Sequence, residues 1–157
     1  MEKLSIRILK PNKLSVLTEL FTYNDVSEMI TSNTKKMENG EIDVFCLYLE
    51  ERLIGELRVA YTHKDSRFAI MGKKAYLYAL RIHKDFRGNG YGKYLLDEVI
   101  NNLYQKGYKE YTIGVEEDNK PALRLYSKLG FSELVATIDE EYQGDSYTYS
   151  LYCLKKQ

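Results

Sequence analysis

The segment RGNGYG, residues 87–92, combines an arginine with three glycines at alternate positions. Glycine weakens helices and strands because it has the most backbone freedom to lose, yet an amphipathic helical pattern starts directly after this segment. A glycine turn leaves the backbone N–H groups of a helix N-terminus free of side-chain bulk, and the helix dipole favours an anion there. Arg87 can add a charge-assisted hydrogen bond to the same anion. Taken alone, the segment is equally compatible with a phosphate site and with a glycine-rich surface turn.

A second segment with chemical potential is NKPALRLYSKLGF, residues 119–131. Asn119 is suited to cap the N-terminus of a helix, proline follows in the first turn, and Gly130 is suited to end the helix. Helical spacing puts Ala122 and Tyr126 on one face. A tyrosine phenol, whose unperturbed pKa is about 10, is protonated at neutral pH and can donate a proton to a leaving group. Most of the 15 tyrosines of this sequence must nevertheless be structural.

The elements that must position these residues follow from apolar periodicity. The strand-like segments are 5–9, 42–49, 53–61, 75–82, 111–115, 133–138 and 147–154. Helical spacing occurs at 14–21 and 26–30, after residue 90 up to Gly107, and between Asn119 and Gly130. The strand at 75–82 is apolar on both faces apart from Arg81, which predicts a central position in the sheet. The expected order is a hairpin, then β-α-β-α, then two further strands.

Composition narrows the class of protein. The chain has no repeat, linker or low-complexity tract, so we expect a single domain over residues 1–157. Its 23 basic and 23 acidic residues give zero net charge, which argues against broad nucleic-acid binding. The N-terminus lacks a secretory signal and no apolar run approaches the roughly 20 residues of a membrane-spanning helix, so we expect a cytoplasmic protein without a membrane partner. Cys46 and Cys153 are interpreted as buried free thiols, and a metal site is not expected.

Three phosphate-loop patterns compete for the glycine segment. A P-loop needs GxxxxGK followed by Ser or Thr, which is absent. A dinucleotide fold needs GxGxxG directly after the first strand of a parallel sheet, whereas this run is GxGxG, begins well after Ile82 and follows a hairpin. The third pattern fits: RGNGYG resembles the R-x-x-G-x-G/A signature of the GNAT superfamily of N-acetyltransferases, in register at Arg87, Gly90 and Gly92.

The resemblance extends beyond this loop. The stretch YALRIHKDFRGNGYGKYLLDEVI is similar to the family's central strand, pyrophosphate loop and following helix. GVEEDNKPALRLYSKLGF resembles its second signature, in which an asparagine precedes a helix with A-x-x-L-Y-x-x-x-G-F. The similarity covers residues 75–131, and outside that span only the order of elements agrees. It implies a mixed α/β fold with a mostly antiparallel sheet, in which the central parallel strands splay apart.

The resemblance also implies an acetyl-CoA-dependent N-acetyltransferase that moves the acetyl group directly to a primary amine. Backbone groups of Leu80 and Ile82 should bind the pantetheine arm, Arg81 between them belongs to the same cofactor-binding stretch, and Asn119 should touch the arm or stabilise its loop. Tyr126 should contact the thioester and act as the catalytic acid. The residues expected to wrap the pyrophosphate are Arg87, Gly88, Asn89, Gly90, Tyr91 and Gly92. Because the strand splays, the N–H of Ile82 is a candidate donor to the oxyanion.

The general base and the acceptor stay open. Many relatives place a glutamate where this sequence has Tyr78, and Glu116 and Glu117 are alternative bases that also fit a solvated acidic turn. Acidic residues at 116–118 and 139–145 could attract a cationic amine. A small amine, an antibiotic, a peptide N-terminus and a protein lysine are all compatible, as is a homodimer. The alternatives to an enzyme are a non-catalytic acyl-CoA-binding module and a nucleotide-binding module.

Overall fold

The computed structural model describes residues 3–142 and 144–157. The predicted domain also includes Met1, Glu2 and Gln143, which lie outside the described residues. None of the helices in the described part of the chain has both the length and the apolar character needed to cross a membrane.

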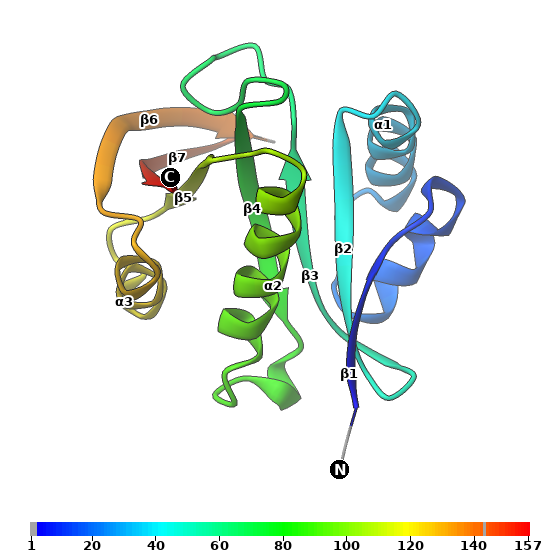
Figure 1. Ribbon diagram of the computed structural model, residues 1–157. Coiled ribbons are helices and arrows are strands. Elements are labelled where there is room, and N and C mark those ends of the chain that lie inside the picture. The colour runs from blue at the N-terminus through cyan, green and yellow to red at the C-terminus, as the bar shows by residue number, and fades with distance from the viewer. Residues whose placement is uncertain (1–2, 143) are drawn as a thin grey trace.

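Strands and helices occur in the order expected from the sequence (Figure 1). The strands are β1 (Leu4–Ile8), β2 (Ile42–Leu49), β3 (Arg52–Ala60), β4 (Lys74–Ile82), β5 (Glu110–Val115), β6 (Glu133–Tyr142) and β7 (Asp145–Lys155). The α-helices are α1 (Val26–Glu38), α2 (Tyr91–Gln105) and α3 (Lys120–Leu129), and the 3-10 helices are η1 (Pro11–Glu19) and η2 (Lys84–Phe86).

The strands form one seven-stranded sheet in the order β1-β2-β3-β4-β5-β7-β6. Only β4 and β5 pair in parallel, and the other neighbours are antiparallel. The strand predicted to be central, β4, is the middle one of the seven, since a strand that is apolar on both faces must be covered on both. The mixed, mostly antiparallel α/β fold is therefore confirmed.

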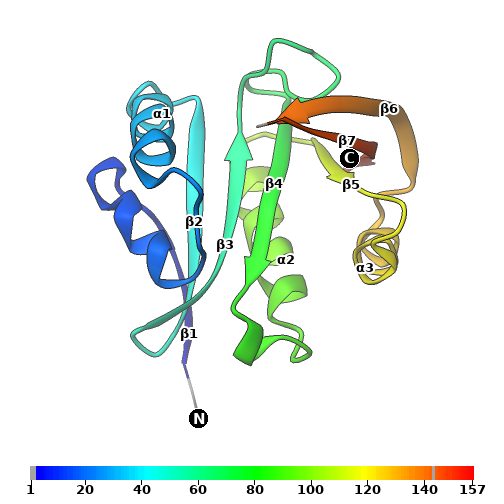
Figure 2. The same ribbon diagram turned by 180° about the vertical axis from the view of Figure 1, so that it is seen from behind.

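The two parallel strands separate at their C-terminal ends, as expected. Their pairing runs from Lys74 opposite Glu110 to Leu77 opposite Ile113 and stops there. Beyond this point β4 continues to Ile82 and β5 only to Val115, and their arrowheads point in different directions in Figure 2. A gap thus opens in the middle of the sheet from Tyr78 onward.

A β-bulge in β4 lies beside this gap. Arg58 of β3 pairs with Tyr78 and Glu56 pairs with Arg81, so Ala79 and Leu80 together lie opposite a single β3 residue. Ala79 has φ 55°, which is uncommon for a residue with a Cβ. A bulge bends its strand and re-aims side chains, and here it puts Tyr78 and Arg81, three positions apart, on the same face.

Each face of the sheet carries its own hydrophobic core. Helices α2 and α3 cover one face, where Leu80 and Ile82 pack with them. Helices η1 and α1 cover the other face, against Tyr76 and Tyr78 (Figures 1 and 2). The segment at 11–19 is a 3-10 helix, in which the three-residue spacing of the buried Leu14 and Leu17 keeps both on one side.

The C-terminal hairpin is longer than the sequence pattern indicates. Asp139, Glu140 and Glu141 extend β6 and pair with β7 through Glu141 opposite Ser146. Polar cross-strand contacts support this extension, since the hydroxyl of Thr148 donates a 2.7 Å hydrogen bond to Asp139. The acidic run is therefore strand rather than turn, and its side chains have fixed directions.

Candidate functional site

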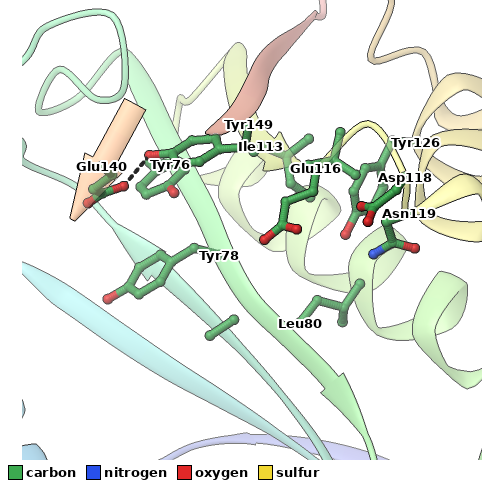
Figure 3. A pocket seen from close by; sticks show the side chains of 13 residues that line it. Tyr76, Tyr78, Leu80, Ile113, Glu116, Asp118, Asn119, Tyr126, Glu140 and Tyr149 are labelled. Carbon is green, nitrogen blue, oxygen red and sulfur yellow. Dashed lines mark hydrogen bonds between the residues drawn. The ribbon is translucent and has the colours of Figure 1, made fainter. Parts of the chain in front are cut away.

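A pocket of about 650 Å³ occupies the gap between the splayed strands (Figure 3). Three of the predicted site residues line it together, namely Leu80 from β4, Asn119 from the start of α3 and Tyr126 from within α3. The remaining lining residues are Tyr76, Tyr78, Ala79, Ile113, Gly114, Val115, Glu116, Asp118, Glu140 and Tyr149. Residues from the two sequence signatures thus meet in one cavity.

Tyr126 is held rigidly in the wall of this pocket. The residue is only 8% exposed, and its ring packs edge-on against Phe131 with 6.1 Å between centroids. Burial raises the pKa of Tyr126 to about 12, because removal of water disfavours the phenolate. The phenol therefore keeps its proton at neutral pH, as a proton donor to a departing thiolate must.

Asn119 is the N-cap of α3, as its sequence context predicts. Its side-chain oxygen accepts a hydrogen bond of 3.3 Å from the backbone N–H of Ala122. Gly130, with φ 104°, ends the same helix. The amide oxygen of Asn119 thus serves the helix cap. Its amide nitrogen, which is the donor of the side chain, remains for a ligand in the pocket.

The glycine turn stands at the N-terminus of α2. Gly90 is the N-cap residue, and both Gly88 and Gly90 have φ 80°, a conformation that side chains disfavour. A Cβ at either position would have no heavy atom within 4 Å, so open space lies beside this backbone. Gly92 differs, since its Cβ would lie 3.8 Å from Cγ1 of Ile82. The turn thus combines free helix N–H groups with room for a bulky anion.

Two side chains of the same segment brace the turn in this structure. Arg87 donates from Nε to the carbonyl oxygen of Ile82 at 3.0 Å. Asn89 donates from its amide nitrogen to the carbonyl oxygens of Phe86 and Arg87, at 3.1 and 3.3 Å. Both side chains are exposed, and Tyr91, the first residue of α2, is half-buried with its ring 6.5 Å from that of Phe86.

The backbone of Ile82 faces the open side of β4. The N–H of His83 donates to the carbonyl of Ile54 in β3 at 2.7 Å. Because backbone groups alternate along a strand, those of Ile82 point away from β3, toward the side that β5 leaves unpaired. The bond from Arg87 to the Ile82 carbonyl lies on that side. The N–H of Ile82 is thus directed toward the open side of β4.

The side chain of Arg81 lies away from the pocket that contains Tyr126. Its guanidinium is 2.9 Å from the buried carboxylate of Glu56 and 4.3 Å from the ring centre of Phe21. It lines a second pocket, together with Tyr23 and Arg58. The bulge turns the Arg81 side chain onto the face covered by η1 and α1, and its backbone lies opposite Glu56 of β3 rather than on the open edge of β4.

The structure separates the two candidate bases. Both glutamates are exposed. Glu116 lines the pocket, and its carboxylate lies between Tyr78 and Tyr126 in Figure 3, whereas Glu117 is not among the lining residues. Tyr78 lines the pocket too. Burial raises the pKa of the Tyr78 phenol, which makes it a poor base.

Tyr149, a lining residue that the sequence pattern did not mark, contacts Glu140 of the acidic run. The hydroxyl of Tyr149 donates a 2.7 Å hydrogen bond to Oε2 of Glu140 (Figure 3). The acidic run that contains Glu140 is visible in the sequence, but its place depends on the register of the β6–β7 hairpin. Gly114 of β5 is a further lining residue that the sequence pattern did not mark, and a Cβ there would lie 2.8 Å from the ring of Tyr149.

Comparisons with known proteins agree with this geometry. Mycothiol acetyltransferase from Actinosynnema mirum is 26% identical over 148 residues, which cover 87% of this chain and 47% of that protein. The [ribosomal protein bS18]-alanine N-acetyltransferase of Haemophilus ducreyi is 33% identical over 91 residues, which cover 55% of this chain and 61% of that protein. The aligned part of this chain thus spans less than two thirds of the length of each of these relatives.

The fold is also found in solved structures. The Salmonella typhimurium protein yncA, solved with its cofactor acetyl-CoA, superposes with a TM-score of 0.71 at 17% identity, covering 98% of this chain and 94% of that one. A family model described as the Acetyltransferase (GNAT) family matches residues 14–131, a span that contains the splayed strands, the glycine turn and Tyr126. The chain therefore belongs to the GNAT family of acetyltransferases.

Proposed function

We propose that this protein is an acetyl-CoA-dependent N-acetyltransferase that moves the acetyl group directly to a primary amine. The observation that carries the proposal is the gap beyond Leu77 and Ile113, which holds Tyr126 in its wall. The free end of β4 leads from this gap to the glycine turn at the N-terminus of α2. The names of the curated relatives and the acetyl-CoA bound by a structural neighbour support the same assignment.

The residues present fit acetyl-CoA. The open space beside Gly88 and Gly90 and the free N–H groups of α2 suit a pyrophosphate, with Arg87 as the accompanying cation. The unpaired backbone edge of Leu80 and Ile82 suits the amide groups of a pantetheine arm, which would add to β4 like a further strand. The amide nitrogen of Asn119 can donate to the same arm.

The chemistry follows from the groups that line the pocket. An acceptor that arrives as an ammonium ion first gives a proton to the carboxylate of Glu116, which frees the nitrogen lone pair. The nitrogen attacks the thioester carbonyl carbon, and the N–H of Ile82 donates to the developing oxyanion. When the intermediate collapses, the C–S bond breaks and the phenol of Tyr126 protonates the sulfur. The amide nitrogen loses its remaining extra proton to the Tyr126 phenolate through water, and Glu116 releases the proton it took from the ammonium ion to solvent, so both side chains return to their starting states.

The matched pair Glu116 and Glu117 tests the base. Glu116→Gln should lower kcat by about 10²-fold, the lower end of the usual scale for a general base. Glu117→Gln should leave kcat unchanged, because its exposed carboxylate does not line the pocket. Equal effects of the two substitutions on kcat would show that Glu116 is not the general base. The assignment as an acetyltransferase would be unaffected.

The function itself is tested by acetyl-CoA turnover with a panel of amines, preceded by thermal-shift measurements with acetyl-CoA, NAD and ATP. We expect stabilisation by acetyl-CoA alone and release of CoA thiol with at least one amine. Stabilisation without turnover on any amine would favour the non-catalytic acyl-CoA-binding module, and stabilisation by NAD or ATP would favour a nucleotide-binding module. The cytoplasmic location and a homodimer belong to the same proposal, with fractionation and analytical ultracentrifugation as their tests.

A further inference from the structure

We infer that the amine acceptor carries a second positive charge, which Glu140 binds beside the rings of Tyr76 and Tyr78. This inference rests on the proposed acetyl transfer and names the class of its substrate. The reacting nitrogen must lie near Tyr126 and Glu116, whereas Glu140 lies at the opposite end of the pocket in Figure 3. We therefore expect Glu140 to bind a different part of the acceptor.

The charge of the pocket favours a cation. Three carboxylates line it, those of Glu116, Asp118 and Glu140, and its described lining contains no lysine, arginine or histidine. The whole chain has a formal net charge of zero, so this negative charge is local to the pocket. A concave site lined by one sign of charge concentrates ligands of the opposite sign.

The aromatic wall beside Glu140 suits an organic cation. The rings of Tyr76 and Tyr78 stack with centroids 5.2 Å apart and planes 11° apart. Burial raises the pKa of both phenols, that of Tyr76 to about 12, so both rings are neutral. An ammonium group beside such rings gains cation–π attraction in addition to its ion pair.

Glu140 itself is held in place by a specific arrangement. Tyr149 donates to its Oε2 at 2.7 Å, which leaves Oε1 for a ligand. Burial and the neighbouring Glu140 raise the pKa of Tyr149, so its hydroxyl remains a donor. The Tyr149 ring lies so close to Gly114 that a Cβ there would be 2.8 Å from it. A glycine weakens a central strand, and here it makes room for the residue that holds Glu140.

A neighbouring cavity shows where the preference of the pocket for a positively charged ligand ends. It shares Tyr76, Tyr78 and Glu140 with the pocket and continues past Lys36, Lys64 and Glu41. The two lysines offset its carboxylates, so the cavity beyond Glu140 is not selective for positive charge. The second cation of the acceptor should therefore sit at Glu140.

This chemistry is shared by a free diamine and by the lysine side chain of a peptide whose α-amino group is free. The test compares putrescine with butylamine, which have the same carbon chain and differ in the second amine. At neutral pH, kcat/KM of the wild-type protein should be about tenfold higher for putrescine, the equivalent of about 1.4 kcal/mol. A second comparison uses a lysine-containing dipeptide and its norleucine analogue. It distinguishes a peptide acceptor from a free diamine.

The ratio of kcat/KM for putrescine to kcat/KM for butylamine tests whether Glu140 causes the preference for the diamine. Glu140→Gln should reduce the putrescine-to-butylamine ratio to about one to two, and Tyr149→Phe should reduce it partly, because the carboxylate loses its anchor. Glu117→Gln, an exposed carboxylate outside the pocket, should leave the ratio at its wild-type value.

Three results would overturn the inference. The first is equal kcat/KM values for putrescine and butylamine together with equal values for the two dipeptides. The second is a putrescine-to-butylamine ratio that is unchanged in Glu140→Gln. The third is an equal loss of kcat/KM on both amines in Glu140→Gln, which would assign Glu140 to the reacting nitrogen. If no amine is acetylated, the proposed function fails instead. Calorimetry of putrescine and butylamine with the wild-type and Glu140→Gln proteins then tests the inference on its own, and equal affinities would reject it.

Discussion

The Nε atom of Arg87 donates a 3.0 Å hydrogen bond to the carbonyl oxygen of Ile82. Both partners have other expected roles in the proposed complex, since the carbonyl lies on the edge suited to pantetheine and the guanidinium belongs to the pyrophosphate loop. In this structure each of the two groups is the hydrogen-bond partner of the other. Acetyl-CoA binding should therefore exchange this internal bond for two ligand contacts.

Replacement of Arg87 by alanine tests this exchange. Because hydrogen bonds to charged groups contribute about 1.5–3 kcal/mol, the affinity for acetyl-CoA should fall roughly 10- to 100-fold. S-acetylpantetheine, which lacks the pyrophosphate, should bind the variant at least as well as the wild type, because the Ile82 carbonyl is released. Calorimetry with both ligands measures the difference. An equal loss for both ligands would show that Arg87 supports the fold of the loop rather than the pyrophosphate.

The glycine turn allows a steric test with a matched control. Gly90→Val places a side chain in the open space beside the turn, where the pyrophosphate is expected, and acetyl-CoA binding should be largely lost. Gly40→Val introduces a similar backbone strain, since Gly40 has φ 73° and open space too, but it lies after the C-terminal end of α1. Thermal unfolding should show comparable destabilisation of both variants. Retained acetyl-CoA affinity in a folded Gly90→Val protein would contradict the pyrophosphate site.

Tyr126→Phe keeps the buried ring and removes the proposed proton donor. We expect kcat to fall by about 10²-fold or more, the usual scale for a general acid. The affinity for acetyl-CoA should barely change, because the lost interaction matters mainly in the transition state. Single-turnover rates avoid masking by slow product release. A phenylalanine variant with a near-wild-type single-turnover rate would reduce Tyr126 to a packing role.

The buried phenols also predict a loss of stability at alkaline pH. The pKa of Tyr126 is raised to about 12 in the folded protein, whereas an unfolded tyrosine titrates near 10. Between these values the unfolded chain loses a proton that the native state keeps, so the free energy of unfolding falls as pH rises from about 10 to 12. Below about pH 10 both states are protonated and the effect vanishes.

Urea unfolding of wild type and Tyr126→Phe between pH 9 and about pH 11.5 measures this contribution. With pKa values of about 10 and about 12 in the two states, the wild type should lose about 2 kcal/mol through this phenol by about pH 11.5, and the variant should lose that much less stability across the range. Tyr76 and Tyr111, whose pKa values are also raised to about 12, make the wild-type decline steeper but contribute equally to both proteins. Parallel curves for the two proteins would mean that the Tyr126 phenol gains access to water.

The sequence alone determined the elements whose signals are local. Asn119 and Gly130 delimit α3 because an N-cap side chain and a residue with positive φ act within one helical turn. The glycine turn before α2 follows from the same kind of signal at Gly90. The central position of β4 was readable because a strand covered on both faces must be apolar on both. The resemblance to a known family then linked Tyr126 to the glycine turn.

Tertiary structure decided the rest. No local signal marks the bulge at Ala79, a residue with φ 55°, yet this bulge directs Arg81 away from the pocket with Tyr126. Glu140 reaches the pocket only through the register of the β6–β7 hairpin, and a shift of one residue would turn it to the other face. Its anchor, Tyr149, depends in turn on a glycine in a third strand, β5. Such contacts join segments far apart in the chain, and their geometry exists only once the sheet has assembled.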